Sequence, residues 1–398
     1  MGTFMTRKVL FLAAVISLLI VSSVLAQTLL PEDPARGARL FVNKGCVKCH
    51  ALKGEGGKAG PDLGKIDLGD TQLDLAAKLW NHIPSMVAGI ERAKIMKPHL
   101  TGEELGSISA YLYFLKYFDE PGDATRGKFL FNEKGCMACH PQTGKGKKGE
   151  SGLNEFPQNI SPVFLSMEIW NHGPQMIANM VTLGMKWPDF KETEMIDLLE
   201  YIKANAKGPK EIAYITPGNP KEGRRVFQSK GCIECHPAQG GKGPASGIDL
   251  SKRSKAYYGS LTRVVSAMWN KGPTVLAKMS QTKTGIPKFS PKEMADLISY
   301  LYFLHFMDEI GNPVNGKKSF SDLGCLKCHG IDGKRGELMH IDLLKYQKTT
   351  NPMEIAAGIW NHGGEIHQAT KAKGIQWPRF KKGEMADVLE YLRTPKKK

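Results

Sequence analysis

The chain has 398 residues, more than a single hydrophobic core usually serves, so we expect about two to four small domains. Hydrophobic residues make up 41% and charged residues 24% of the sequence, a composition that excludes a largely disordered chain. The formal net charge of +16 would by itself indicate a nucleic acid or an anionic membrane as partner.

The N-terminus carries the features of an export signal. Arg7 and Lys8 precede an uncharged apolar stretch at residues 9–25, and the small residue Ala26 follows it. We expect residues 1–26 to be a signal peptide, cleaved after Ala26, which would place the protein in the periplasm or outside the cell. An uncleaved N-terminal membrane anchor is the alternative, because the apolar stretch is close to the minimum length of a spanning helix.

The eight cysteines form four identical patterns, each of two cysteines three positions apart with a histidine directly after the second. They are Cys46, Cys49 and His50; Cys136, Cys139 and His140; Cys232, Cys235 and His236; and Cys325, Cys328 and His329. This pattern is the attachment signature of c-type haem, in which two thiols form thioethers with one porphyrin and the histidine binds the iron. Because no cysteine is left over, the pattern argues against disulfides, zinc and redox-active dithiols. We therefore predict four covalently attached haem c groups with these histidines as proximal iron ligands.

Four bound haems also change the interpretation of the charge. Each haem adds about two negative charges through its propionates, and these offset much of the positive excess. We therefore expect no nucleic acid partner. Two lysine-rich runs, at residues 145–148 and 396–398, are either solvated surface or a docking site for an acidic redox protein.

The four regions around the motifs are similar to one another well beyond the cysteines, which indicates a repeat array. A glycine stands nine positions, and a phenylalanine five positions, before the first cysteine of every motif. These residues are Gly37, Gly127, Gly223 and Gly316, and Phe41, Phe131, Phe227 and Phe320. We expect a helix to run into each attachment site, with the phenylalanine buried and the glycine where another backbone approaches closely.

Two further helices are expected in each region. One is headed by a Trp-Asn pair, and we expect its tryptophan to pack against a haem edge. The pairs are Trp80-Asn81, Trp170-Asn171, Trp269-Asn270 and Trp360-Asn361. The other is an amphipathic helix that ends the region and carries a tyrosine at a shared position, at residues 103–118, 192–203, 292–306 and 383–392.

On these motifs each region resembles a small class I cytochrome c domain, and the resemblance covers nearly all of the chain after the signal. It implies an all-α fold of four tandem class I cytochrome c-like domains, numbered one to four below, at residues 33–118, 122–207, 219–307 and 311–395. In that family the first helix carries the haem motif, a loop supplies the distal ligand, and the last helix crosses the first.

The endings of the domains alternate. Domains one and three end in Tyr-Leu-Tyr-Phe-Leu, at residues 111–115 and 300–304, whereas domains two and four share Trp-Pro-x-Phe, at residues 187–190 and 377–380. This alternation resembles two dihaem cytochromes in tandem. We therefore predict that residues 207–220 separate a dihaem module of domains one and two from one of domains three and four.

The sixth iron ligand has to be chosen from three sets of residues. The face of the Trp-headed helix six, seven and ten positions after the tryptophan offers a candidate in every domain, and this set is complete. It consists of Met86, Met176 (with Met180 as a second choice), Met279 and His367. We predict Met86, Met176, Met279 and His367 as ligands, with haem four lowest in potential because His367 gives it a second imidazole.

The other two sets are incomplete. The loop before the last helix, where the family usually keeps its methionine, offers Met96 and Met185 in domains one and two alone. A histidine follows Trp-Asn at His82, His172 and His362, whereas domain three has Lys271 at that position.

From these features we expect an exported tetrahaem cytochrome that transfers electrons between other redox proteins, acidic or membrane-bound, and that has no catalytic residues of its own. A multihaem oxidoreductase, such as a peroxidase or an enzyme that oxidises sulfur compounds, would need one haem with an open distal side, for which domains three and four are the candidates. A haem subunit or filament of a larger assembly is the third hypothesis.

Overall fold

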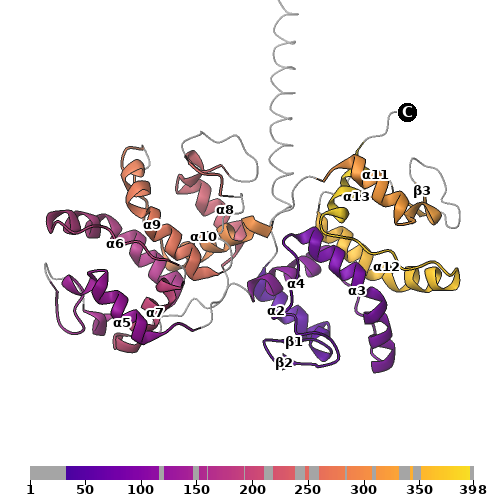
Figure 1. The fold of residues 1–398 in the computed structure, drawn as a ribbon, viewed down its shortest axis with the longest axis horizontal. Helices are drawn as coiled ribbons and strands as arrows, with labels where there is room; N and C mark the ends of the chain where they lie inside the picture. The colour runs from indigo at the N-terminus through magenta and orange to yellow at the C-terminus, as the bar shows by residue number, and fades with distance from the viewer. Residues whose placement is uncertain are drawn as a thin grey trace, which may run out of the picture. The chain divides into compact units, whose positions relative to one another are not determined.

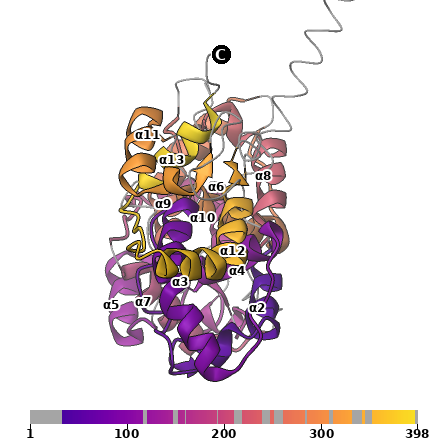
Figure 2. The same ribbon diagram turned by 90° about the vertical axis from the view of Figure 1, so that its right-hand side faces the viewer.

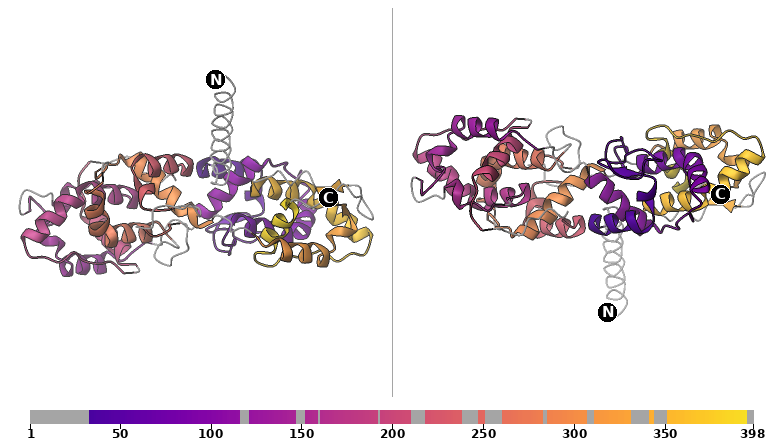
Figure 3. Two further views of the ribbon diagram at one scale, coloured as in Figure 1. Left: turned by 90° about the horizontal axis from the view of Figure 1, so that it is seen from above. Right: turned by 90° about the horizontal axis from the view of Figure 1, so that it is seen from below.

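The computed structural model describes residues 33–115, 121–146, 152–158, 160–191, 193–209, 218–237, 247–250, 260–282, 285–306, 311–330, 341–343 and 351–394. These residues are mostly helical (Figures 1 and 3), which confirms the all-α fold class. Two short ladders accompany the helices: β1 (Ala51–Leu52) pairs antiparallel with β2 (Glu55–Gly56), and β3 (His329–Gly330) pairs in parallel with β4 (Ile341–Asp342). In the described residues no helix has both the length and the hydropathy to cross a membrane, and the apolar stretch at residues 9–25 lies outside them.

A short helix begins each domain and leads into the haem motif. These helices are α2 (Pro34–Asn43), α5 (Ala124–Glu133), α8 (Pro220–Ser229) and α11 (Pro313–Asp322). A glycine directly before the first cysteine then takes the left-handed backbone conformation, with φ between 75° and 79° at Gly45, Gly135, Gly231 and Gly324. Since glycine adopts this conformation without steric cost, it reverses the chain and aims the cysteines away from the helix.

The longest helix of each domain contains the Trp-Asn pair. These helices are α3 (Gln72–Ala93), α6 (Pro162–Thr182), α9 (Leu261–Met279) and α12 (Pro352–Ala372). The tryptophan lies more than two turns inside the helix, so our prediction that Trp-Asn heads it is wrong. The reason is an upstream cap, because the side chains of Thr71, Ser161 and Asn351 accept hydrogen bonds from backbone amides of the first turn.

The last helix of each domain lies near its predicted range: α4 (Gly102–Phe114), α7 (Glu194–Asn205), α10 (Pro291–Phe303) and α13 (Glu384–Arg393). In domains two to four it crosses the first helix at the predicted glycine. A Cβ atom built on Gly127, Gly223 or Gly316 would lie 2.0, 1.9 or 1.9 Å from a backbone oxygen of that helix. The predicted close approach of two backbones is therefore confirmed at these three glycines.

The predicted phenylalanines form the centre of each domain. Phe41, Phe131, Phe227 and Phe320 are all buried, which confirms that prediction. In domains two, three and four the phenylalanine ring packs against the shared tyrosine of the last helix, with ring centroids 5.4, 5.4 and 6.0 Å apart. Aromatic packing thus holds the first helix, and with it the haem motif, against the end of the domain.

The four domains are grouped two and two. One compact unit contains Gly37–Ser109 and Phe306–Lys398, so it joins most of domain one to domain four, with α3 packed against α12 (Figure 2). The other contains Asp33–Arg36 and Ala110–His305, so it joins domain two to domain three, with α6 packed against α9. Our prediction that domain one pairs with two, and three with four, is therefore wrong. Residues 210–217 of the predicted boundary lie outside the described residues.

Candidate haem sites

Each pair of cysteines lies on one tight turn. In domain one the turn η1 (Cys46–Lys48) follows Gly45, and the amide of His50 donates to the Cys46 carbonyl at 3.0 Å. The equivalent bond is 2.9 Å long in domains two and three. None of the eight cysteines forms a disulfide, so all are available for attachment. Two thiols on one turn, with a histidine fixed beside them, meet the requirement for attaching a porphyrin through two thioethers.

The cysteines are poorly suited to thiol exchange, which uses the thiolate. Burial raises the pKa of the first cysteine in every motif, and for Cys136, Cys232 and Cys325 it raises the pKa to about 11. A raised pKa favours the neutral thiol at physiological pH. A neutral thiol is a poor nucleophile, which disfavours thiol exchange at these turns.

The histidine that follows the cysteines is held through its Nδ1 atom. In domain one Nδ1 of His50 lies 3.0 Å from the Pro61 carbonyl oxygen, and in domain three Nδ1 of His236 lies 3.1 Å from that of Ile248. When Nδ1 donates to a carbonyl, the ring is fixed in the tautomer whose Nε2 is free to bind a metal. Both rings are thus oriented as proximal iron ligands.

Domain three contains a cavity of about 350 Å³ beside its haem motif. Cys232, Cys235 and His236 line it together with mostly apolar side chains of α9 and α10, including Met279 and Leu301. An apolar slot with two cysteines and a histidine in its wall fits a covalently attached haem, which would bind there through these three residues. Such a haem supplies a one-electron couple of ferric and ferrous iron.

A second histidine faces the proximal one in domains one and two. The ring of His82, on α3, lies with its centroid 6.3 Å from that of His50 at an interplanar angle of 56°. The ring of His172, on α6, lies 6.3 Å from that of His140 at 65°. Burial, and then the neighbouring His50, lower the pKa of His82, so its ring stays neutral, which is the form that binds metals.

The methionines that we predicted as ligands differ in their surroundings. Met86 and Met176 are half-buried and lie one helical turn beyond His82 and His172. Met279 is buried and lines the cavity that contains His236. The assignments of Met86, Met176 and Met279 as ligands remain predictions.

His367, the predicted ligand of domain four, packs edge-on against Trp377, with ring centroids 5.6 Å apart. Its Nδ1 atom is buried and accepts or donates no hydrogen bond within the described part of the chain. The equivalent residue of domain three, Leu276, faces Gly173 of domain two. That comparison favours a place for His367 at the contact between domains, and its assignment as a ligand remains a prediction.

Of the alternative ligands, Met96 is 92% exposed. His362 is exposed as well, and its Nδ1 atom lies 3.3 Å from a carboxylate oxygen of Glu365.

The Trp-Asn pairs bind the paired domain. The tryptophan of every pair donates its indole N–H to the carbonyl of a proline in the loop before the last helix of the paired domain. The donors and acceptors are Trp80 and Pro378, Trp360 and Pro98, Trp170 and Pro287, and Trp269 and Pro188, at 2.6 to 2.9 Å. The bonds are reciprocal, because each domain both offers a Trp-Asn pair and presents a loop.

Every asparagine binds the same loop two residues further on, where it donates to a carbonyl and accepts from the amide of one residue. The partners are Asn81 and Phe380, Asn361 and Leu100, Asn171 and Phe289, and Asn270 and Phe190, at 2.8 to 3.1 Å. We call each Trp-Asn pair with its bound loop a clamp. Four clamps hold domain one to four and domain two to three.

A proline inside the long helix completes two of the clamps. Pro84 and Pro273 have no N–H, so the carbonyls of Trp80 and Trp269, four residues earlier, have no partner within the helix. Each accepts a bond of 3.2 Å from an indole of the paired domain, Trp377 and Trp187 respectively. The same indoles stack on Trp80 and Trp269, with ring centroids 4.4 and 4.3 Å apart.

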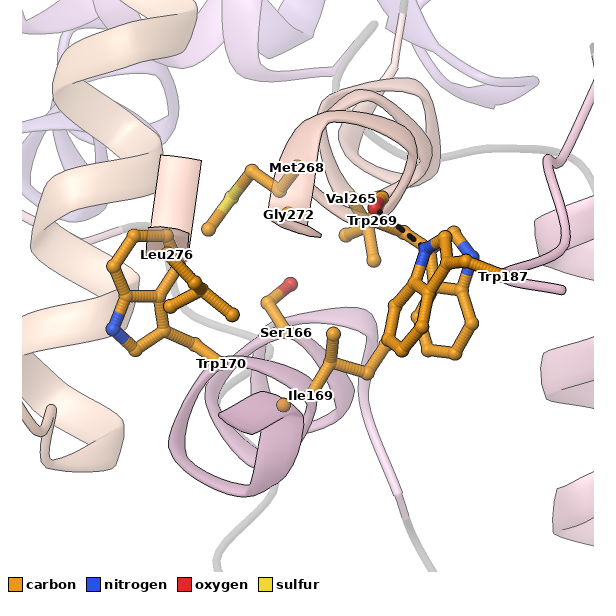
Figure 4. Close-up of a pocket in the computed structure, with 10 residues that line it drawn as sticks. Ser166, Ile169, Trp170, Trp187, Val265, Met268, Trp269, Gly272 and Leu276 are labelled. Atoms are coloured by element: carbon orange, nitrogen blue, oxygen red, sulfur yellow. Dashed lines mark hydrogen bonds between the residues drawn. The ribbon is translucent and has the colours of Figure 1, made fainter. Parts of the chain in front are cut away.

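The contact between domains two and three is closely packed (Figure 4). Trp187 and Trp269 lie face to face on one side, and Trp170 lies on the other, with Leu276 above it. The space that remains between these side chains is about 10 Å³, which is at the lower limit for one water molecule. Trp170 also lines the cavity of domain three, so it packs at the edge of a haem site of the paired domain.

The residues of the clamps recur at fixed positions in the sequence. The Trp-Asn pair is the same in all four domains, and a proline stands 18 positions after the tryptophan of each pair, at Pro98, Pro188, Pro287 and Pro378. The repeat therefore identifies the residues that bind each other, but it does not show which two domains these residues join.

The cytochrome c family model matches four stretches of the chain, at residues 34–116, 124–206, 220–304 and 313–396. Each stretch contains one attachment turn, one long helix with its Trp-Asn pair, and one last helix. No solved structure matches the chain. The chain therefore belongs to the cytochrome c family, with four tandem cytochrome c domains that bind four covalent c-type haems.

Proposed function

We propose that this multihaem cytochrome is an exported electron carrier, which accepts electrons from one redox protein and delivers them to another, and that its haems work as two pairs. The pairs follow the clamps, with domain two beside three and domain one beside four. Export rests on the features of residues 1–26. The excess of 55 lysines and arginines over 39 acidic residues favours acidic partners, whose approach it would accelerate.

The observation that carries the paired arrangement is the position of Trp170. This residue lines the haem cavity of domain three, yet it lies on α6 of domain two, two residues before His172. His172 in turn faces the proximal His140. One stretch of three residues thus connects the haem sites of two domains. It provides a short path between them, although the motifs of these domains are far apart in the sequence.

The same stretch is held rigidly at both ends. Trp170 donates to the Pro287 carbonyl, and Asn171 makes two bonds to Phe289, which lines the same cavity. A fixed separation favours electron transfer because little rearrangement accompanies each step. The residues of the clamp therefore serve the proposed function by holding the two sites in place.

A redox titration of the purified chain tests this function. We expect it to take up four electrons per chain without any substrate, to return them to an added oxidant, and to bind no carbon monoxide when reduced. Electron exchange with an acidic redox protein should slow as ionic strength rises, because salt screens the charges. Carbon monoxide binding at one haem, together with turnover of peroxide, would instead support the multihaem oxidoreductase.

A further inference from the structure

We propose that His82 and His172, rather than Met86 and Met176, are the sixth iron ligands in domains one and two. Two haems would then have two imidazole ligands each. The assignment depends on haem binding, which the family establishes, and holds whether or not the chain is exported.

The distance between the histidine rings supports the first part. Metal-to-imidazole bonds are about 2.0–2.1 Å long, so one iron held between two imidazoles places their ring centres about 6 Å apart. The observed separation is 6.3 Å for His50 and His82, and 6.3 Å for His140 and His172. Two domains with different surrounding sequences thus show the same separation.

Other contacts also fix both members of the first pair and the second histidine of the other pair. Nδ1 of His50 is bound by the Pro61 carbonyl, which leaves its Nε2 for the iron. On the opposite side His82 directly follows Asn81, whose side chain is bound to Phe380 of domain four through two hydrogen bonds. His172 follows Asn171 in the same way. The clamp therefore sets the rotation of the long helix and with it the position of the second histidine.

Met86 and Met176 lie four residues after these histidines. Four residues correspond to a shift of about 6 Å along a helix axis, so the methionine and the histidine cannot both stand opposite the same proximal nitrogen. With the histidine in that place, the methionine is left as a wall of the haem slot. This is the more common role of a methionine at helical spacing.

Domain three differs at this position. Lys271 replaces the histidine and is exposed, and a lysine ammonium has no lone pair to offer a metal. Met279 lines the same cavity as His236, but eight residues correspond to a shift of about 12 Å along α9, so Met279 does not occupy the position of His82 and His172. The proposed assignment therefore covers domains one and two.

Two matched leucine variants of the full-length holoprotein test the assignment: Met86→Leu and Met176→Leu. The readouts are the thioether-to-iron charge-transfer absorption of the oxidised protein and a potentiometric titration. We expect neither variant to reduce this absorption or to change the potential of a haem as the loss of an iron ligand would. Loss of the absorption in either variant would overturn the assignment for that domain.

A second pair of variants tests the histidines directly. In His82→Gly and His172→Gly one low-spin haem should become high-spin, and added imidazole should restore the low-spin spectrum. Haem content, measured on denatured protein, shows that the variant has matured. If either glycine variant keeps all its haems low-spin without imidazole, the histidine is not a ligand. None of these readouts depends on a redox partner, so failure of the proposed function and failure of this assignment are separable.

Discussion

A chain that is cut once between residues 207 and 220 is expected to stay together in native buffer. The cut separates domains one and two from domains three and four, yet both clamped pairs, one with four and two with three, bridge it. The two fragments, with two haems each, should therefore co-elute on size exclusion and separate only in denaturant. A specific protease site inserted in this segment and a native gel are sufficient to test the prediction.

Removal of asparagines from the clamps provides the control. Asn81→Leu together with Asn171→Leu takes one asparagine from each pair, and with it four hydrogen bonds between domains. At about 1 kcal/mol for each bond, the fragments of the cut variant should associate about a thousandfold more weakly. If the unsubstituted fragments separate at once in native buffer, domain one pairs with two and the clamps do not form.

Gly223→Ala should unfold domain three at a markedly lower temperature. The added Cβ atom would lie 1.9 Å from the backbone oxygen of Asp296 and 2.7 Å from the Cβ atom of Tyr300. Since backbone atoms cannot move aside, α8 and α10 must separate, and the packing of Phe227 on Tyr300 is lost. We expect a cost of about 3 kcal/mol and a fall of about 15 °C in the Tm of this domain, measured by calorimetry.

Gly272→Ala is the matched control in the same domain. No atom lies within 4 Å of a Cβ atom built on Gly272, in the middle of α9, so alanine fits there. It should leave the Tm unchanged or raise it, because alanine favours a helix by about 1 kcal/mol over glycine. Equal melting temperatures for the two variants would show that the helices of domain three do not cross at Gly223.

The sequence predicts the interior of each domain well, because the features concerned are local. The cysteine pattern fixes the attachment turns, and the phenylalanine and glycine before it predict a buried ring and a close helix crossing. Both are observed, at Phe227 and Gly223 for example. The contacts of these residues lie within one domain, so their recurrence in the sequence repeat predicts these contacts directly.

The pairing of domains could not be predicted in this way. Alternating endings report which domains are similar in sequence, whereas contacts are made by complementary surfaces. Trp80 and Pro378 are 298 positions apart. No feature of the sequence around either residue identifies the other as its partner. Because every domain carries both halves of a clamp, the sequence permits several pairings, and the packing of the long helices selects between them.

The choice of sixth ligand was beyond the sequence for a different reason. His82 and Met86 lie four residues apart and therefore share one face of α3. Helical periodicity identifies that face, but it does not show which turn of α3 lies opposite His50. The proposed assignment rests instead on the distance between the two histidine rings.

The mass of the denatured, purified chain gives the haem count directly. We predict a mass equal to the polypeptide from Gln27 onward plus four haems, with no thiol left to react with an alkylating reagent, because all eight cysteines are used. Three haems or fewer, or a reactive thiol, in protein matured by a host that attaches haem c would contradict the four haem sites described above.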